Sequence, residues 1–437
     1  MTSVLSNLAA PGESGGPARG TALLGFTLAA AWALLAFAAL LLASVKLHSP
    51  SLLADTPWLT YGRLHAAGTT TLLFGFILPV AALAGLGLLA RLGGGRGGVA
   101  GLPLAGTLLW NLGVAAGTAA VLAGRNSGAE WLEYPARVFP LFIVAAALWA
   151  ASALVIHARR DEAEPYPAAW FLLAALLVLP WFLTVIPTLG AGPEAAGMTG
   201  VVVRRWALNG LVSVAAGGVG LAGLLYLVPK LAGVPLASRQ LALLGFWAWI
   251  FFAPWAVTAH GDPVPRWLVS AGVAGRTLAA IGFLALACNL GMTLAGGGWA
   301  KLRAAAGGRW LLAGLAGWMG AGALAFLVNL RAGAALFRLT WFTPGLELLV
   351  LLAFLLPVLL ALQGDAWSGI AGRPAPAVLH GLGAGLVLGG VALVVVPLLL
   401  AGVMQGFLVN NPERPFLNVM RAGMGPVRLV AVGWLLV

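Results

Sequence analysis

The chain has 437 residues, of which 61% are hydrophobic and 8% are charged, and its mean hydropathy is +1.00. Soluble domains are about 45–50% apolar and about 25% charged, so a water-soluble fold of this length could not bury so much apolar surface. The net charge of +12 would suggest a nucleic-acid partner in a soluble protein, but here the basic residues lie in short loops between apolar runs. The composition predicts an all-α polytopic membrane protein with no nucleic-acid partner.

The first 20 residues are polar and rich in Gly and Pro, which predicts a disordered N-terminal lead ahead of one transmembrane domain over 21–437. No cleavable signal peptide is expected. A membrane helix needs about 20 apolar residues. Eleven runs of about this length follow, at 22–44, 64–90, 99–123, 138–157, 167–189, 206–229, 239–260, 268–295, 309–330, 341–363 and 376–408.

A twelfth run begins near Pro426 and reaches Val437. It would cross only about 18 Å of a hydrocarbon core that is about 30 Å thick. The sequence therefore predicts about 12 transmembrane helices, the last being a half-span or one that continues past Val437. Lys and Arg number 11 on one face and 12 on the other, so the charge bias does not orient the bundle.

Polar side chains within the predicted spans are few, and such groups usually face the interior of a bundle. The informative ones are His65, Asn209, His260, Arg276 and Glu347. A histidine at the end of a span either ligates a metal or heme, or forms a hydrogen bond at the interface. Asn209 is expected to form an interhelical hydrogen bond. Arg276 and Glu347 either pair with each other or bond free backbone groups near a kink.

Several strings resemble, in chain order, segments of subunit I of the heme-copper oxidases. Residues 62–65 (GRLH) resemble the start of helix 2, and residues 225–230 (LYLVPK) resemble the end of helix 6 in the C family, the cbb-type cytochrome c oxidases. Residues 246–251 (FWAWIF) resemble helix 7, and residues 343–345 (TPG) resemble the approach to the heme ligands of helix 10. The order and the number of spans resemble this bundle, whose scaffold nitric oxide reductases share.

In that family, two histidines hold a low-spin heme, one holds a high-spin heme and three hold copper. The resemblance places His65 at a low-spin heme ligand and His260 at one copper ligand. Other ligand positions fall on residues without an imidazole: Asn209 for a copper ligand, Ala259 for another, and Leu346 and Leu348, on either side of Glu347, for the two heme ligands of helix 10. A tyrosine of helix 7 falls on Ala253. The resemblance implies a retained scaffold whose oxygen-reducing centre cannot assemble.

The resemblance implies no catalytic residue, a vestigial metal position at His260, and a heme position at His65, where one of the two ligands of the low-spin heme remains. The expected cofactor content is none, with a single heme b on His65 as the alternative. Two acids in the loop after the third span, Glu130 and Glu133, also resemble a carboxylate-bearing loop of the family. They either face solvent or bind a cation or a partner's basic patch.

The preferred hypothesis is a subunit I homologue that does not reduce dioxygen and acts as a structural or assembly subunit of a respiratory complex. Its partners would be other membrane subunits and lipid, in the bacterial inner (cytoplasmic) membrane. One alternative is a redox subunit that relays electrons through a heme on His65. Another is a twelve-helix secondary transporter, in which Pro180, Pro187 and Pro344 break helices and Arg276 and Glu347 line the path.

Overall fold

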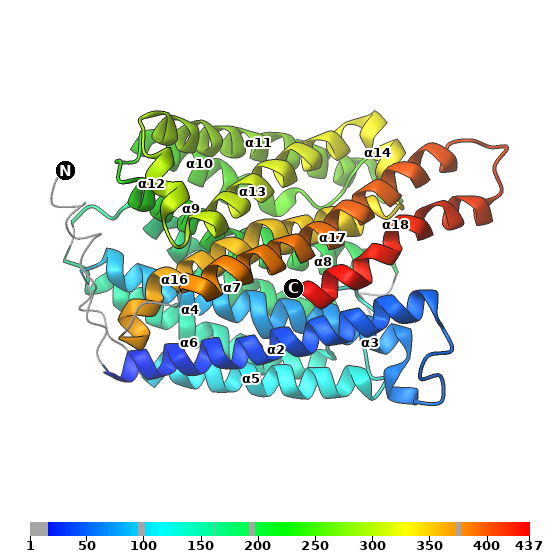
Figure 1. Cartoon of the computed structure of the whole chain (residues 1–437), viewed down its shortest axis with the longest axis horizontal. Coiled ribbons are helices and arrows are strands. Elements are labelled where there is room, and N and C mark those ends of the chain that lie inside the picture. The colour runs from blue at the N-terminus through cyan, green and yellow to red at the C-terminus, as the bar shows by residue number, and fades with distance from the viewer. Residues whose placement is uncertain (1–15, 95–100, 162, 192–196, 373–376) are drawn as a thin grey trace.

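The computed structural model describes residues 16–94, 101–161, 163–191, 197–372 and 377–437. These residues form an elongated bundle of roughly parallel and antiparallel helices and contain no strand (Figure 1). Eleven of the described helices are long and apolar enough to cross a membrane. The all-α polytopic fold is thereby confirmed. We call the side on which the first crossing begins the N-side, and the opposite side the far side.

The first half of the bundle contains six crossings. Their helices are α2 (Gly16–His48), α3 (Tyr61–Thr71) continued by η2 (Leu72–Ile77) and α4 (Leu78–Leu92), α5 (Gly101–Leu122), α6 (Phe139–Ala158), α7 (Pro167–Leu189), and α8 (Met198–Asn209) continued by η5 (Gly210–Ala216) and α9 (Gly217–Ala232). Short 3-10 turns η1 (Pro57–Leu59) and η3 (Ala136–Val138) lie in the far-side loops.

The second half continues the same up-and-down course. Its helices are α10 (Arg239–Phe252) with η6 (Ala253–Trp255), α11 (Arg266–Ala295), α12 (Trp299–Ala304), α13 (Gly308–Asn329), α14 (Arg331–Phe337), α15 (Phe342–Leu348) continued by η7 (Leu349–Leu355) and α16 (Leu356–Ala371), α17 (Ala377–Val409) and α18 (Phe416–Leu436).

The centre of the bundle is formed by the second and sixth crossings. In the most apolar 18-residue segment of Tyr61–Leu92, 94% is buried, and in that of Met198–Ala232, 89% is buried. The corresponding segments of the other long apolar helices are 28–67% buried. The second and sixth crossings therefore bury nearly their whole circumference, which explains why their sequences are apolar on every face.

A π-helical segment interrupts three crossings, at η2, η5 and η7. The wider turn of a π-helix leaves a carbonyl without its usual donor, and such turns are frequent at functional sites. Tryptophan supplies the missing donor twice: Trp110 Nε1 donates to the Phe74 carbonyl at 2.6 Å, and Trp249 Nε1 donates to the Ser213 carbonyl at 3.1 Å. Two of the π-helical segments are thus fixed by side chains from neighbouring crossings.

The first helix begins at Gly16, ahead of the apolar run predicted at 22–44, and Pro17 is tolerated in its first turn. Two predicted boundaries were wrong. The last helix begins at Phe416 and not near Pro426, which lies inside it, so the last crossing is 21 residues long and not a half-span. The run at 239–260 forms a 14-residue helix, α10, because Pro254 cannot continue it.

Close backbone contact between α15 and α17 depends on Gly402. A Cβ placed there would lie 2.1 Å from the Phe342 backbone nitrogen. We expect Gly402→Ala to force the two helices apart and lower the free energy of unfolding by about 1–3 kcal/mol. Titration with sodium dodecyl sulfate measures this loss. Gly389→Ala in the same helix, where nothing lies within 4 Å of the added carbon, is the matched control and should leave the midpoint in place.

Candidate functional site

The Asn209 side chain joins the sixth and seventh crossings. Its Nδ2 donates to the carbonyls of Ala253 at 2.8 Å and Pro254 at 3.2 Å, and its Oδ1 accepts from Ser213 Oγ at 2.8 Å. The interhelical hydrogen bond predicted for Asn209 is therefore present. These bonds use both amide hydrogens and the amide oxygen, so Asn209 is fixed as a backbone partner at the end of α10.

His260 lies in the loop that follows η6, and Arg338 contacts this loop through one carbonyl and one carboxylate. The His260 carbonyl accepts from Arg338 Nη1 at 3.2 Å, while Arg338 Nη2 pairs with Asp262 Oδ1 at 2.7 Å. Among the described residues, no three His, Cys, Asp or Glu side chains gather closely enough to hold a metal ion. With the Asn209 amide bonded to backbone, the residues present do not fit a three-imidazole copper site.

His65 lies at the start of α3, on the far side. Its imidazole stacks on the Tyr61 ring with centroids 5.6 Å apart and is half-buried. Leu348, at the end of α15, is buried with 8% of its surface exposed, and it carries no donor atom. The residues present therefore do not fit a low-spin heme held by two histidines. They offer one imidazole, on His65.

Glu347 and Trp131 link the tenth crossing to the loop after α5. Trp131 Nε1 donates to Glu347 Oε2 at 2.8 Å, and the Trp131 backbone is held at a φ of 65°. A bulky residue in the left-handed region costs of order 1–3 kcal/mol, so the surrounding contacts must hold it there. The loop thus docks onto the membrane-embedded end of α15 through one buried indole.

The two acids of this loop, Glu130 and Glu133, lie close enough to interact electrostatically. Glu133 Oε2 accepts from the Gly128 amide at 3.1 Å, which closes the loop on itself. Burial raises the pKa of the Glu133 carboxyl, and the bond from Gly128 opposes that rise. Glu130, the other acid, is exposed. Tyr134, which follows Glu133 in the chain, is fully buried. Its hydroxyl lies 2.9 Å from Thr118 Oγ1, and burial raises the pKa of this hydroxyl to about 12.

Arg276 belongs to a separate network at the far-side ends of α11 and α13. Its Nη2 donates to the Ala256 carbonyl at 2.8 Å and its Nη1 donates to Asn329 Oδ1 at 3.2 Å. The predicted alternative of a bond to free backbone is therefore correct for Arg276. It is wrong for Glu347, whose partner is a side chain, and no ion pair joins these two residues among the described contacts.

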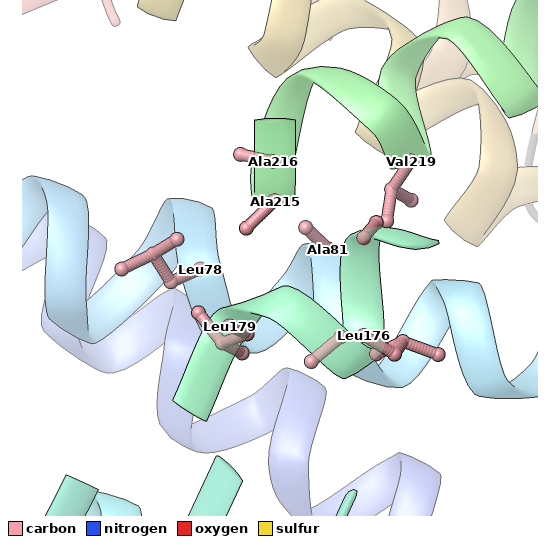
Figure 2. A pocket seen from close by; sticks show the side chains of 9 residues that line it. Leu78, Ala81, Leu176, Leu179, Ala215, Ala216 and Val219 are labelled. Atoms are coloured by element: carbon pink, nitrogen blue, oxygen red, sulfur yellow. The ribbon is translucent and has the colours of Figure 1, made fainter. Parts of the chain in front are cut away.

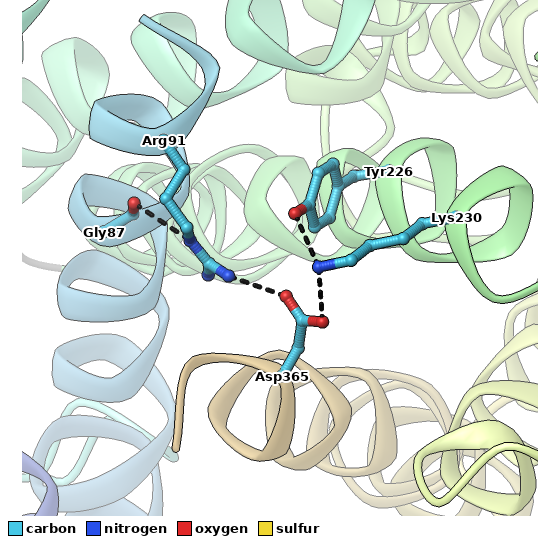
Figure 3. A network of polar contacts seen from close by, with 5 residues as sticks. All are labelled: Gly87, Arg91, Tyr226, Lys230 and Asp365. Carbon is cyan, nitrogen blue, oxygen red and sulfur yellow. Dashed lines mark hydrogen bonds and ion pairs between the residues drawn. The ribbon is translucent and has the colours of Figure 1, made fainter. Parts of the chain in front are cut away.

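A charged cluster that sequence reasoning missed lies on the N-side. Asp365 Oδ2 is 2.6 Å from Arg91 Nη1, and Asp365 Oδ1 is 2.7 Å from Lys230 Nζ (Figure 3). The predicted apolar run ends at residue 363, so Asp365 lies outside it. Its position two residues beyond an apolar run was the available signal, because α16 continues to Ala371.

A small apolar cavity lies between the second, fifth and sixth crossings. Leu78, Ala81, Leu176, Leu179, Ala215 and Val219 are among its lining residues, with no polar side chain in the lining (Figure 2). The space that a water-sized sphere can reach is about 10 Å³. This is at most the room that one water needs, and an apolar cavity of this kind stays dry. It cannot hold a porphyrin.

The fold and these contacts define a polytopic membrane bundle whose described interior is apolar and poor in imidazole groups. A family model for cytochrome c and quinol oxidase polypeptide I matches residues 21–433. The chain belongs to this family.

Curated relatives agree with this assignment. The chain is 26% identical over 295 residues to a cytochrome c oxidase subunit 1 homolog of Azorhizobium caulinodans, covering 64% of this chain and 52% of that protein. It is 27% identical over 281 residues to a Cbb3-type cytochrome c oxidase subunit CcoN1 of Stutzerimonas stutzeri, covering 60% and 56%. The chain thus matches about half the length of these relatives.

A solved structure of a heme-copper terminal oxidase dimer has a similar fold. The TM-score is 0.67 at 13% sequence identity, and the match covers 97% of this chain and 82% of that one. The predicted heme-copper oxidase subunit I-like bundle is confirmed at the level of fold.

We expect Asn209→Leu to lower the free energy of unfolding by about 1–3 kcal/mol, because the Pro254 carbonyl loses its donor and the Ala253 carbonyl keeps only its bond from the Ala256 amide. Denaturation in mixed micelles measures this. Ser213→Ala is the matched control: it removes one hydroxyl and leaves the two carbonyl bonds, so its loss should be smaller. Equal losses in the two variants would show that the bonds to Ala253 and Pro254 contribute nothing.

A second pair of variants tests the loop contact. Glu347→Gln keeps an oxygen that can accept from the Trp131 indole, whereas Glu347→Leu leaves that buried N–H without an acceptor. We expect the leucine variant to lose about 1–3 kcal/mol of stability and the glutamine variant to lose less. Limited proteolysis of the loop at 124–135 reports on its release. A glutamine variant as labile as the leucine variant would rule out this hydrogen bond as the anchor.

Proposed function

We propose that this chain is a subunit I homologue that does not reduce dioxygen and acts as a structural or assembly subunit of a respiratory membrane complex. The observation that carries the proposal is the bonding of Asn209. The side chain at a position that resembles a copper ligand is bonded to the carbonyls of Ala253 and Pro254. Asn209 thus joins the sixth crossing to the seventh through hydrogen bonds to the protein backbone.

The second support is the set of side chains at the other ligand positions. Leu346, Leu348 and Ala259 carry no donor atom for iron or copper. Imidazole is the ligand that suits both metals at such positions, since it is a neutral nitrogen donor. The proposed partners are other membrane subunits and lipid, and the proposed location is the inner membrane of a bacterium. The transporter alternative has less support, because Arg276 and Glu347 lie in separate networks.

Spectroscopy of the purified native complex tests the proposal. We expect this chain, isolated with its partners, to contribute no pair of hemes, no copper by elemental analysis, and no oxygen uptake that its deletion from the complex would remove. A Soret band that resolves two hemes in this chain, together with bound copper and oxygen consumption, would contradict the proposal.

A second candidate, a redox subunit with one heme b, rests on His65. The half-buried imidazole at the start of α3 is the one donor that remains among the heme-ligand positions. Here a reduced-minus-oxidised difference spectrum of wild type should show a single b-type heme that disappears in His65→Ala, with Tyr61→Phe as the matched control. An intact complex whose spectrum is the same in both variants, or that shows no heme, would end this candidate.

A further inference from the structure

The charged cluster of Arg91, Lys230 and Asp365 lies toward the N-side ends of the second, sixth and tenth crossings. Arg91 is in the last turn of α4, Lys230 is in the last turn of α9, and Asp365 is in α16. Charged residues at the ends of transmembrane helices commonly meet phospholipid headgroups. The side chains of this cluster are 23%, 23% and 12% exposed, so a ligand from the membrane surface can reach them.

The cluster has more positive than negative charge. Two cations share the single carboxylate of Asp365, which leaves one net positive charge. No further acid contacts either cation among the ion pairs of the described residues. Arg91, Lys230 and Asp365 come from separate helices and converge on one point (Figure 3). Because the carboxylate holds the two cations close together, their charges act on the same small region.

The cluster also has hydrogen-bond donors that these contacts do not use. Arg91 donates through Nη1 to Asp365 and through Nε to the Gly87 carbonyl at 3.4 Å, and Nη2 has no partner among the described residues. Lys230 Nζ donates to Asp365 and, at 2.9 Å, to Tyr226 Oη, which leaves its third N–H. The Tyr226 hydroxyl accepts this bond and can still donate its own hydrogen.

We propose that this cluster binds a phosphate group that carries one negative charge, of the kind found in the headgroup of an anionic phospholipid. Guanidinium and ammonium groups with donors to spare are the groups that recognise phosphate oxygens, and a tyrosine hydroxyl can add a third donor. Basic positions between transmembrane helices bind anionic headgroups by the same chemistry. Asp365 fixes the spacing of the two cations, and the phosphate neutralises the charge that Asp365 leaves.

Lipid retention by the full-length protein tests the site. The protein is reconstituted in nanodiscs of phosphatidylcholine with a minor fraction of phosphatidylglycerol, and bound phosphatidylglycerol is counted after exchange into detergent. Lys230→Gln and Arg91→Gln should each weaken retention about fivefold, the effect of about one interfacial cation. Arg309→Gln removes an exposed cation from the N-side end of α13 and should leave retention unchanged. Size-exclusion profiles and helical circular dichroism establish that each variant is folded.

Two further measurements answer two questions: whether the phosphate comes from lipid or from solution, and whether the cluster binds a ligand or serves only as a structural ion pair. If inorganic phosphate raises the thermal midpoint of delipidated wild type but not of Lys230→Gln, the site takes phosphate chemistry from solution as well as from lipid. Asp365→Asn removes the competing anion and should strengthen phosphatidylglycerol retention. Variants that shift the thermal midpoint while neither phosphatidylglycerol nor phosphate distinguishes them from wild type would overturn the proposal.

Discussion

The structure depends on one constraint: a carbonyl freed inside a membrane bundle must find a donor within the protein. α10 ends after 14 residues, and in the turn that follows the Ala253 carbonyl accepts from the Ala256 amide at 3.2 Å, whereas the Pro254 carbonyl has no backbone donor among the described residues. Asn209 donates to both. A few residues further on, Arg276 donates to the Ala256 carbonyl. The short seventh crossing is therefore compatible with a bilayer because two side chains on other helices complete its hydrogen bonds.

The same constraint accounts for the π-helical segments of the central crossings. Trp110 and Trp249 each donate to a carbonyl within one of these segments, at Phe74 and Ser213. Ser213 also bonds to Asn209, so η5, α8 and η6 form one hydrogen-bonded unit. In an interior with few imidazoles, this unit joins helices through amide, hydroxyl and indole groups. Cross-links between the protein's own groups thus hold the sixth and seventh crossings of this bundle together.

Much of the fold could be predicted, because a hydrocarbon solvent makes apolar length a direct signal. The ends of helices could not. Pro426 and the polar residues before it suggested a loop, yet the helix begins ten residues earlier, at Phe416. The interhelical bond of Asn209 was predictable because a buried amide in an apolar helix must be bonded. Its partners were not, since they are backbone groups of a segment whose helix ends unexpectedly early.

The polar contacts between distant segments could not be predicted from spacing. Glu347 bonds an indole 216 positions away, in a loop whose Trp131 adopts a positive φ that no sequence pattern indicates. Asp365 joins Arg91 and Lys230 across 274 and 135 positions, and it lies just beyond an apolar run where a solvated acid was the natural expectation. Only the packing of the central crossings brings these groups together.

An experimental density map of the native complex, at a resolution that shows side chains, tests the central claim most directly. The account predicts the helix arrangement described above, the Asn209 amide against the Ala253 carbonyl, and side-chain density with no metal ion at the end of α10. A map with two porphyrins and a copper ion bound to this chain, or with a different arrangement of the central crossings, would contradict it.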